Sequence, residues 1–236
     1  MKLRTRVVLQ LAALLLALGV SAFAASDGYL YIVHGIPGRD IADNLNPGLP
    51  IDFLINGDCM VRGLTFGSTS GPFSLAAATY DVQVSYANSL APCTNTPVIT
   101  SQVTLATGAS ATIVAALSGG QSALLQFADN LSSVAPGSAR FDFVNSADAP
   151  GLQATLTQVD VKNPKTFTVI ASPDAQQTIT VPAGTYLVKV VAVGSSTVLA
   201  SEQIGLSGQS VTFAYAAGEA ANNSIGLIDR LVKDVF

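Results

Sequence analysis

The stretches ATYDVQVSYANS (residues 78–89) and GTYLVKVVAVGSS (residues 184–196) are two versions of one pattern within a single chain. Tyr80 aligns with Tyr186, and in both stretches valines occupy the second and fourth positions after the tyrosine. Alternation with a period of two is typical of a β-strand that has one face in a core and one face in water. The sequence therefore predicts the same β-strand twice.

The repeat extends well beyond these strands. Three further pairs of segments align: SQVTLATGASATIVAAL from Ser101 with SEQIGLSGQSVTFAYAA from Ser201, FADNL (127–131) with LIDRL (227–231), and YIVHGIPG from Tyr31 with DFVNSADAP from Asp142. A period of about 100 residues is longer than the repeats of solenoids and propellers and is the size of a whole β-sandwich. We interpret the chain as a duplicated domain.

The domain boundaries follow from composition. The segment SSVAPGSA, residues 132–139, is small and polar and contains Pro136-Gly137, as is typical of an interdomain linker. The sequence thus predicts a first domain at 25–131 and a second domain at 140–236. Because the linker is short, we expect the two domains to lie close together.

Turn signals separate short apolar runs within each copy. Asn56-Gly57, inside LPIDFLINGDCMVRGL, is the strongest short hairpin signal, since both residues tolerate positive φ. Thr107-Gly108 and Ser207-Gly208 indicate further turns. Short alternating strands with turns every 8 to 12 residues, on the order of what sandwiches and barrels show, predict an all-β fold.

The N-terminus has the pattern of a secretory signal peptide. Lys2, Arg4 and Arg6 precede an uncharged, mostly apolar run over residues 7–20, and Ala22-Phe23-Ala24 forms an A-x-A cleavage site. We therefore expect residues 1–24 to be cleaved from a secreted protein in the periplasm, on the cell surface or outside the cell. The apolar run is too short to span a bilayer comfortably, so we do not expect an integral membrane protein.

Charge narrows the set of partners. The formal net charge is −4, and three of the 11 basic residues lie in the expected signal peptide, so we expect no nucleic-acid partner. Charged residues make up only 11% of the chain, well below the roughly 25% of typical globular proteins. Either the surface is rich in uncharged polar residues or part of it is covered.

Both cysteines, Cys59 and Cys93, lie in the first copy. An even pair in an oxidising compartment predicts a disulfide. It would join the Asn56-Gly57 hairpin to a loop that is longer in the first copy than in the second.

Three segments together resemble a known family. They are YLYIVHGIPG from Tyr29, IDFLINGDCMVRGLTFGSTSGPFSLAAATYDVQV from Ile51, and ALLQFADNLSSVAPGSARFDFVNSADAP from Ala123. The chain resembles the secreted bacterial family called domain of unknown function 4397, in a tandem arrangement. The resemblance implies two immunoglobulin-like or transthyretin-like β-sandwich domains at or outside the cell surface, and it brings no catalytic residues. The second copy departs from it, because its middle lacks the Asn-Gly hairpin.

Several polar residues have a structural interpretation. Tyr80 and Tyr186 are expected to pack their rings in the core and cap a backbone group with the hydroxyl, as in tyrosine corners. His34 is the only histidine and aligns with Asn145, so we expect either side chain to serve the same strand end.

The loop GRDIADNLNPG could hold a calcium ion, because it clusters Asp40, Asp43, Asn44 and Asn46. Its spacing does not match an EF-hand. Asp and Asn also form turns by bonding their own backbone, and the sequence favours that interpretation.

The sequence predicts a non-enzymatic protein without a cofactor. It would bind an extracellular protein or glycan through its loops, or self-associate as a structural component of the envelope. Two alternatives remain open: a hydrolase that uses paired carboxylates among Asp52, Asp58 and Asp81, and a calcium-dependent binding module. No catalytic, cofactor or metal-binding residues are assigned.

Overall fold

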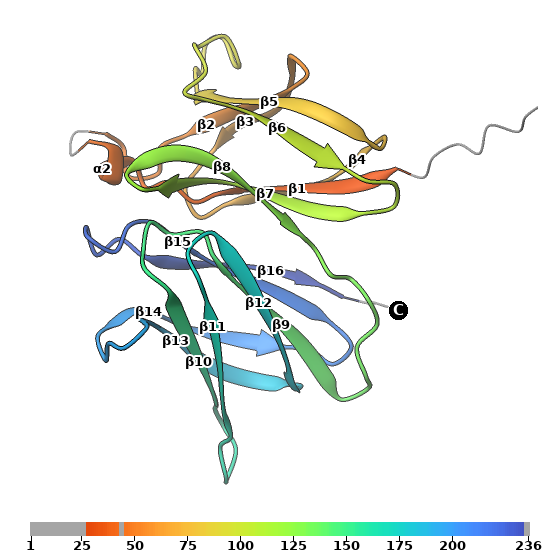
Figure 1. The fold of residues 1–236 in the computed structure, drawn as a ribbon, viewed down its shortest axis with the longest axis vertical. Coiled ribbons are helices and arrows are strands. Elements are labelled where there is room, and N and C mark those ends of the chain that lie inside the picture. Colours follow the sequence, from red (N-terminus) through yellow and green to blue (C-terminus); the bar gives the residue numbers. More distant parts are fainter. Residues whose placement is uncertain (1–26, 43–44, 234–236) are drawn as a thin grey trace, which may run out of the picture.

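Four four-stranded sheets form the described part of the chain, residues 27–42 and 45–233, in this computed structural model (Figure 1). The expected signal peptide at 1–24 lies outside the described residues. The sheets pair into two β-sandwiches, which confirms the predicted all-β fold with two sandwich domains.

The first sandwich contains a sheet in the order β4-β1-β7-β8 and a sheet in the order β3-β2-β5-β6. Its elements are β1 (Gly28–His34), the short helix α2 (Gly38–Ile41), β2 (Ile51–Ile55), β3 (Asp58–Leu64), β4 (Thr69–Leu75), β5 (Ala78–Tyr86), β6 (Ile99–Leu105), β7 (Ser110–Ser118) and β8 (Gln121–Ala128).

The second sandwich repeats this arrangement, with sheets β12-β9-β15-β16 and β11-β10-β13-β14. Its strands are β9 (Ser138–Asn145), β10 (Leu152–Gln158), β11 (Thr166–Ala171), β12 (Ala175–Pro182), β13 (Gly184–Ala192), β14 (Val198–Leu206), β15 (Val211–Ala217) and β16 (Gly226–Val232). In both copies one central pair, β1 with β7 and β9 with β15, is parallel. An identical strand order with the same parallel pair identifies the halves as duplicates.

The repeated tyrosines occupy equivalent places. The Tyr80 hydroxyl donates to the carbonyl of Ala76, and the Tyr186 hydroxyl donates to the carbonyl of Pro182 at 2.7 Å. Both rings are buried in their cores. Each tyrosine thus ties the start of its strand to the preceding turn, which confirms the corner interpretation.

The register corrects the sequence alignment after the tyrosines. Tyr80 lies opposite Val103 and Tyr186 lies opposite Ile204, so Val103 corresponds to Ile204. The alignment from Ser101 with Ser201 pairs Val103 with the neighbouring Gln203 and is wrong by one residue. In a strand such a shift exchanges the two faces. The alignment would have placed the inter-sandwich side chains of β15 in the core.

The two sandwiches stack so that sheet β4-β1-β7-β8 faces sheet β12-β9-β15-β16 (Figure 1). The central strands β7, β9 and β15 are buried on both faces over nearly all of their length. A third hydrophobic cluster fills the space between the sandwiches: Val33, Val114, Ala116, Phe127, Val134, Val144, Val211, Phe213, Tyr215, Ala217 and Ile228. The low charge of these strands therefore reflects an interface inside the chain.

A buried ion pair lies within this interface. The guanidinium of Arg230 on β16 contacts the Asp129 carboxylate after β8 at 2.8 Å, and both side chains are almost fully buried. The same guanidinium lies over the rings of Tyr31 and Phe213, 3.8 and 4.2 Å from their centroids. Cation–π contacts of this kind are strongest where water is excluded. The ion pair connects one sandwich directly to the other.

The connection between the sandwiches is also fixed. Arg140 on β9 donates from Nη1 to the carbonyls of Asn130 and Ser132, at 2.9 and 3.0 Å. The β7–β8 turn is held from the second sandwich, where the Asp148 carboxylate accepts the N–H groups of Gly119 and Gly120. These contacts hold the two copies as one body.

Candidate binding site at a disulfide-anchored loop

The β2–β3 hairpin supplies one side of the candidate site. Its turn consists of Asn56 at φ 51° and Gly57 at φ 86°, the left-handed pair that a two-residue hairpin loop requires. This confirms the hairpin predicted from Asn-Gly and brings Cys59 to the start of β3.

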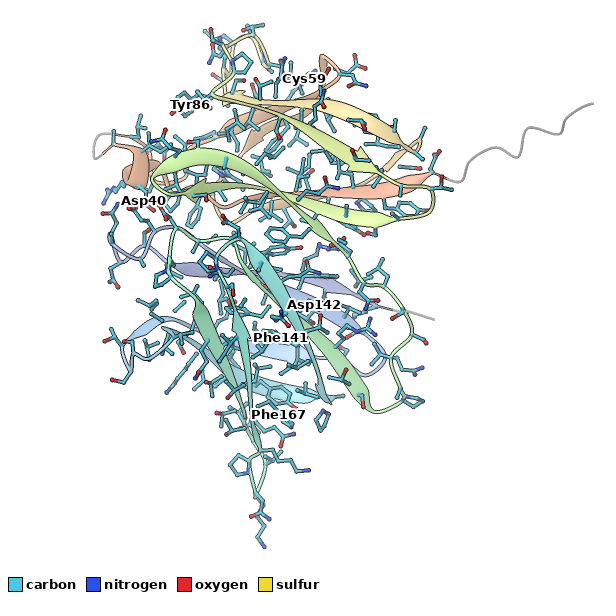
Figure 2. All side chains as sticks on the ribbon, viewed as in Figure 1. Asp40, Cys59, Tyr86, Phe141, Asp142 and Phe167 are labelled. Atoms are coloured by element: carbon cyan, nitrogen blue, oxygen red, sulfur yellow. A yellow bond between two sulfur atoms is a disulfide. The ribbon has the colours of Figure 1, made fainter. Side chains whose placement is uncertain are left out.

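The connection from β5 to β6, residues 87–98, supplies the other side, and we call it the disulfide loop. Cys93 in this loop is bonded to Cys59, with 5.8 Å between their Cα atoms, which confirms the predicted disulfide. Figure 2 shows Cys59 in the outer part of the first sandwich, away from the second sandwich.

Asp52 anchors the disulfide loop from β2. Its side chain is 1% exposed, and its two oxygens accept the N–H of Gly63 at 2.8 Å and the N–H of Cys93 at 2.7 Å. Hydrogen bonds from backbone amides to a carboxylate are among the stronger ones in proteins. Asp52 therefore acts as a bracket between the β3 backbone and the loop. From the sequence, Asp52 is a candidate only for catalysis, and its anchoring role follows from the structure.

Internal hydrogen bonds give the disulfide loop a defined shape. The Asn88 side-chain oxygen accepts the N–H groups of Leu90 and Ala91 at 3.1 and 3.2 Å. Asn95 donates its side-chain amide to the carbonyl of Tyr86 at 2.9 Å. Leu90, whose backbone N–H is one of these donors, has a side chain that is 96% exposed. Because its backbone is held while its side chain lies outside any core, Leu90 is available to a partner.

A cavity of about 370 Å³ lies beside the loop. Prolines and alanine form its apolar walls, and polar side chains lie between them; the lining residues are Pro50, Asp52, Arg62, Gly63, Ala87, Asn88, Ser89 and Pro92. Arg62 is exposed and has no ion pair within residues 27–42 and 45–233. The cavity is within the size range of small-ligand sites.

The second sandwich has no counterpart of this site. The equivalent β13–β14 connection covers only residues 193–197, and the β10–β11 connection, residues 159–165, replaces the Asn-Gly hairpin. Both cysteines belong to the first copy. The duplication has therefore kept the framework and varied the loops.

The three carboxylates weighed for catalysis are not brought together in this cavity. Asp58 is exposed at the start of β3, and Asp81 accepts a hydrogen bond from the side chain of Gln102 at 3.2 Å. Only Asp52 lines the cavity, and backbone amides occupy both of its oxygens.

His34 is fully buried at the end of β1. Its Nδ1 accepts the N–H of Ile36 at 3.3 Å, so the ring proton is on Nε2, which donates to the carbonyl of Leu49 at 2.7 Å. In the second copy Asn145 makes the corresponding bond, from its side-chain amide to the carbonyl of Pro150 at 3.2 Å. Both side chains tie the end of the first strand to the residue two positions before the next strand, as expected.

Stability is expected to fall with acid because of His34. Burial lowers the pKa of His34 to about 4, although the bond to Leu49 opposes this shift. The neutral ring is favoured in the folded state, so its stabilisation is complete above pH 6.5 and is lost as pH falls from 6.5 to 4. Chemical denaturation over this range should show a loss of up to about 3 kcal/mol. His34→Asn, which copies the second sandwich, should flatten this dependence. An unchanged dependence in that variant would refute the assignment.

The candidate calcium ligands are only partly described, since Asp43 and Asn44 lie outside the described residues. The Asp40 carboxylate accepts hydrogen bonds from Asn222 and Ser224 of the second sandwich. The Asn46 side chain accepts the N–H of Gly48 at 2.9 Å, which agrees with the interpretation of this segment as a turn. No cluster of three or more His, Cys, Asp or Glu residues suited to a metal occurs in the described ranges.

Calcium is expected to leave the melting temperature of the mature protein unchanged. An ion that binds only the native state must raise the melting temperature as the concentration of the ion increases. Thermal unfolding with excess calcium, compared with unfolding in a chelator, measures the effect. A rise that depends on calcium concentration would restore the calcium-dependent module.

Residues 28–155 match a family model described as "Domain of unknown function (DUF4397)". The chain belongs to the DUF4397 family. The matched residues run from β1 into β10, so they include the disulfide loop, the hairpin and the whole first sandwich. Within this DUF4397 chain the described residues contain no helix long and apolar enough to cross a membrane.

No curated protein matches the chain. Among solved structures it is similar to a candidate cell adhesion protein from Bacteroides ovatus (8% identity, 90% of this chain and 99% of that chain, TM-score 0.29). It is also similar to a candidate adhesin from Bacteroides ovatus (10% identity, 89% and 94%, TM-score 0.26) and to the Bacillus anthracis TIE protein (11% identity, 82% and 32%, TM-score 0.24). These likenesses are distant.

Proposed function

We propose that this DUF4397 protein is a non-enzymatic, extracytoplasmic binding module whose contact surface is the disulfide loop. The observation that most supports this proposal is that the loop is anchored by a disulfide and by hydrogen bonds to Asp52 and yet exposes the apolar side chain of Leu90. A loop ordered before binding loses little conformational entropy when it meets a partner. Leu90 and the cavity beside it then offer an apolar anchor and a recess on one surface.

Binding to a foreign partner is favoured over self-assembly into an envelope layer. The apolar, charge-poor strands that suggested a covered surface cover one another between the two sandwiches. The remaining exposed large apolar side chains are distributed over several elements, and two of them, Leu90 and Val98, lie in the disulfide loop, with Leu90 by far the most exposed. The partner would be an extracellular protein or glycan.

Location and the absence of catalysis belong to the same proposal. A disulfide is typical of oxidising compartments, and it agrees with the signal-peptide pattern of residues 1–24. Within the described residues, the side chains of Asp52 and His34 both hydrogen-bond to backbone groups and so have structural roles. These contacts support a scaffold for the loop rather than acid–base catalysis.

The test uses the mature chain, Ala25–Phe236, on a printed glycan array and on immobilised fibronectin, laminin and collagen. Leu90→Ser should weaken binding to the best probe about tenfold, as expected for loss of one buried leucine contact. Val161→Ser, which alters an apolar residue that is 47% exposed on the β10–β11 connection, is the matched control and should leave affinity unchanged. Binding that is insensitive to Leu90→Ser, or no binding to any of these probes, would contradict the proposal.

A further inference from the structure

A second cavity, of about 460 Å³, lies where the two sandwiches meet, next to α2. Figure 2 shows Asp40 at this junction, whereas Cys59 lies in the outer part of the first sandwich. Beside two prolines, its lining residues are Arg39, Asp40, Phe66, Asn222, Asn223 and Ser224. Because both copies supply lining residues, this cavity exists only in the tandem protein.

Hydrogen bonds between the copies hold the cavity in place. The Asp40 carboxylate accepts the hydroxyl of Ser224 and the side-chain amide of Asn222, the latter at 3.3 Å. The N–H of Gly218 donates to the carbonyl of Gly35 at 3.2 Å. The floor of the cavity is therefore fixed from both sandwiches.

The β15–β16 connection is rigid where it forms one wall. Gly218 adopts φ 101°, and a Cβ atom there would lie 2.5 Å from the carbonyl oxygen of Ser224, so glycine is required. The N–H of Glu219 donates to the Ser224 hydroxyl oxygen at 2.8 Å. This closed connection presents Asn222 and Asn223 to the cavity.

Hydrogen-bonding capacity is left over on this wall and opposite it. Asn222 donates both amide hydrogens, to Asp40 and to Glu219, which leaves its side-chain oxygen as an acceptor. Within residues 27–42 and 45–233, the side chains of Arg39 and Asn223 have no hydrogen-bond partner, and both are exposed. The cavity thus offers free donors from a guanidinium and an amide together with free acceptors.

Phe66 gives the cavity an apolar wall. The ring is half-buried, packs against the cluster between the sandwiches and contacts the His34 ring edge-on, with 6.4 Å between centroids. It is therefore held in a defined orientation. An aromatic wall beside mixed donors and acceptors is the usual composition of a site for a small polar ligand at a domain interface.

We propose that this inter-sandwich cavity binds one neutral saccharide unit. Each sugar hydroxyl both donates and accepts a hydrogen bond, which suits Arg39, Asn223 and the Asn222 oxygen, while the C–H face of the ring packs on Phe66. Arg39 is opposed by Asp40 in the same lining and by Glu219, which is bonded to Asn222, so the site carries no net positive charge and a neutral ligand is favoured over an anionic one. This site is independent of the disulfide loop.

The probes are cellobiose, maltose, lactose and chitobiose, each titrated into the ¹⁵N-labelled mature chain and followed by amide chemical shifts. At least one disaccharide should shift the resonances of residues 39–40 and 222–224. Arg39→Ala should weaken that binding about tenfold, the loss expected for one hydrogen bond to a charged group. Asn223→Gly should weaken it by up to about tenfold, because a hydrogen bond to a neutral amide contributes less. Glycine suits Asn223 because its φ is 52°.

Arg62→Ala and Leu90→Ser, in the other site, are the controls and should leave disaccharide affinity unchanged. Melting temperatures of all four variants show whether the fold is intact. Absence of shifts with every disaccharide, or shifts that map to the disulfide loop, would overturn the saccharide site. Absence of shifts leaves the test of the disulfide loop unaffected, because that test measures a different surface, whereas shifts at the disulfide loop would assign the saccharide to that loop instead.

Discussion

Asp129→Ala should lower the free energy of unfolding by about 3–5 kcal/mol, the usual cost of removing one partner of a buried ion pair. The Arg230 guanidinium would keep its charge in a site with 7% exposure and lose its contact at 2.8 Å. The Asp129 carboxylate also accepts the hydroxyls of Ser110 and Thr112, both at 2.9 Å, so these donors lose an acceptor as well. The melting temperature should fall by about 10 °C for a chain of this size.

The double variant Asp129→Leu, Arg230→Met should lose less stability than Asp129→Ala alone. Two apolar side chains of similar volume suit the surrounding cluster, whereas a single unpaired charge does not. Denaturant unfolding of Asp129→Ala and of the double variant, each beside the parent protein, measures the two losses. A double variant that is less stable than Asp129→Ala would mean that the ion pair itself holds the sandwiches together. A small effect of Asp129→Ala would contradict the buried interface.

Loss of the disulfide is expected to destabilise the chain by about 4 kcal/mol. The bond closes a segment with a separation of 34 residues, and the chain-entropy model gives a cost of this size when such a closure is removed from the unfolded state. Cys59→Ser with Cys93→Ser, unfolded in denaturant beside the parent protein, measures the loss. The parent protein with a reductant should give the same value.

The same variant should weaken partner binding through the disulfide loop, because Asp52 would remain as its principal anchor to β2 and β3. The pH dependence caused by His34 lies elsewhere and should persist. Unfolding with the midpoint of the parent protein would show that the loop is already fixed without the bond. In that event the disulfide would have no part in ordering the binding surface.

The elements that could be predicted from sequence are those with local signals. The Tyr80 and Tyr186 strands follow from strict alternation, and the first hairpin follows from Asn56-Gly57. The disulfide follows from two cysteines in a secreted pattern. The strands and the hairpin depend on residues that are neighbours in the sequence, and two cysteines allow only one pairing. Contacts between distant residues therefore do little to change these features.

The remainder depends on contacts between distant residues. Strands β7 and β15 are apolar on both faces, and the sequence alone does not say whether another domain, another chain or a ligand covers the outer face. The structure shows that the other copy does. The Asp129–Arg230 pair and the cavity at Asp40 join residues far apart in sequence. Continuous apolar runs in both copies and the low share of charged residues were the available signals for such stacking.

The two sandwiches share a framework but differ in their loops. The first copy carries the disulfide loop and its cavity, whereas the second has short connections at the equivalent places. Matching polar side chains, such as His34 and Asn145, still close the same strand ends. The second sandwich covers the apolar sheet of the first and completes the cavity between them. The two copies therefore form one structural unit.

The covering of each copy's apolar sheet by the other copy is tested most directly by the mass of the mature chain, Ala25–Phe236, measured by light scattering behind a sizing column over a wide concentration range. If the two copies cover each other's apolar sheets, the protein is a monomer at every concentration and its loops remain free for a partner. Assemblies that grow with concentration would contradict this covering within one chain, because they would show that the charge-poor surface is an interface between chains.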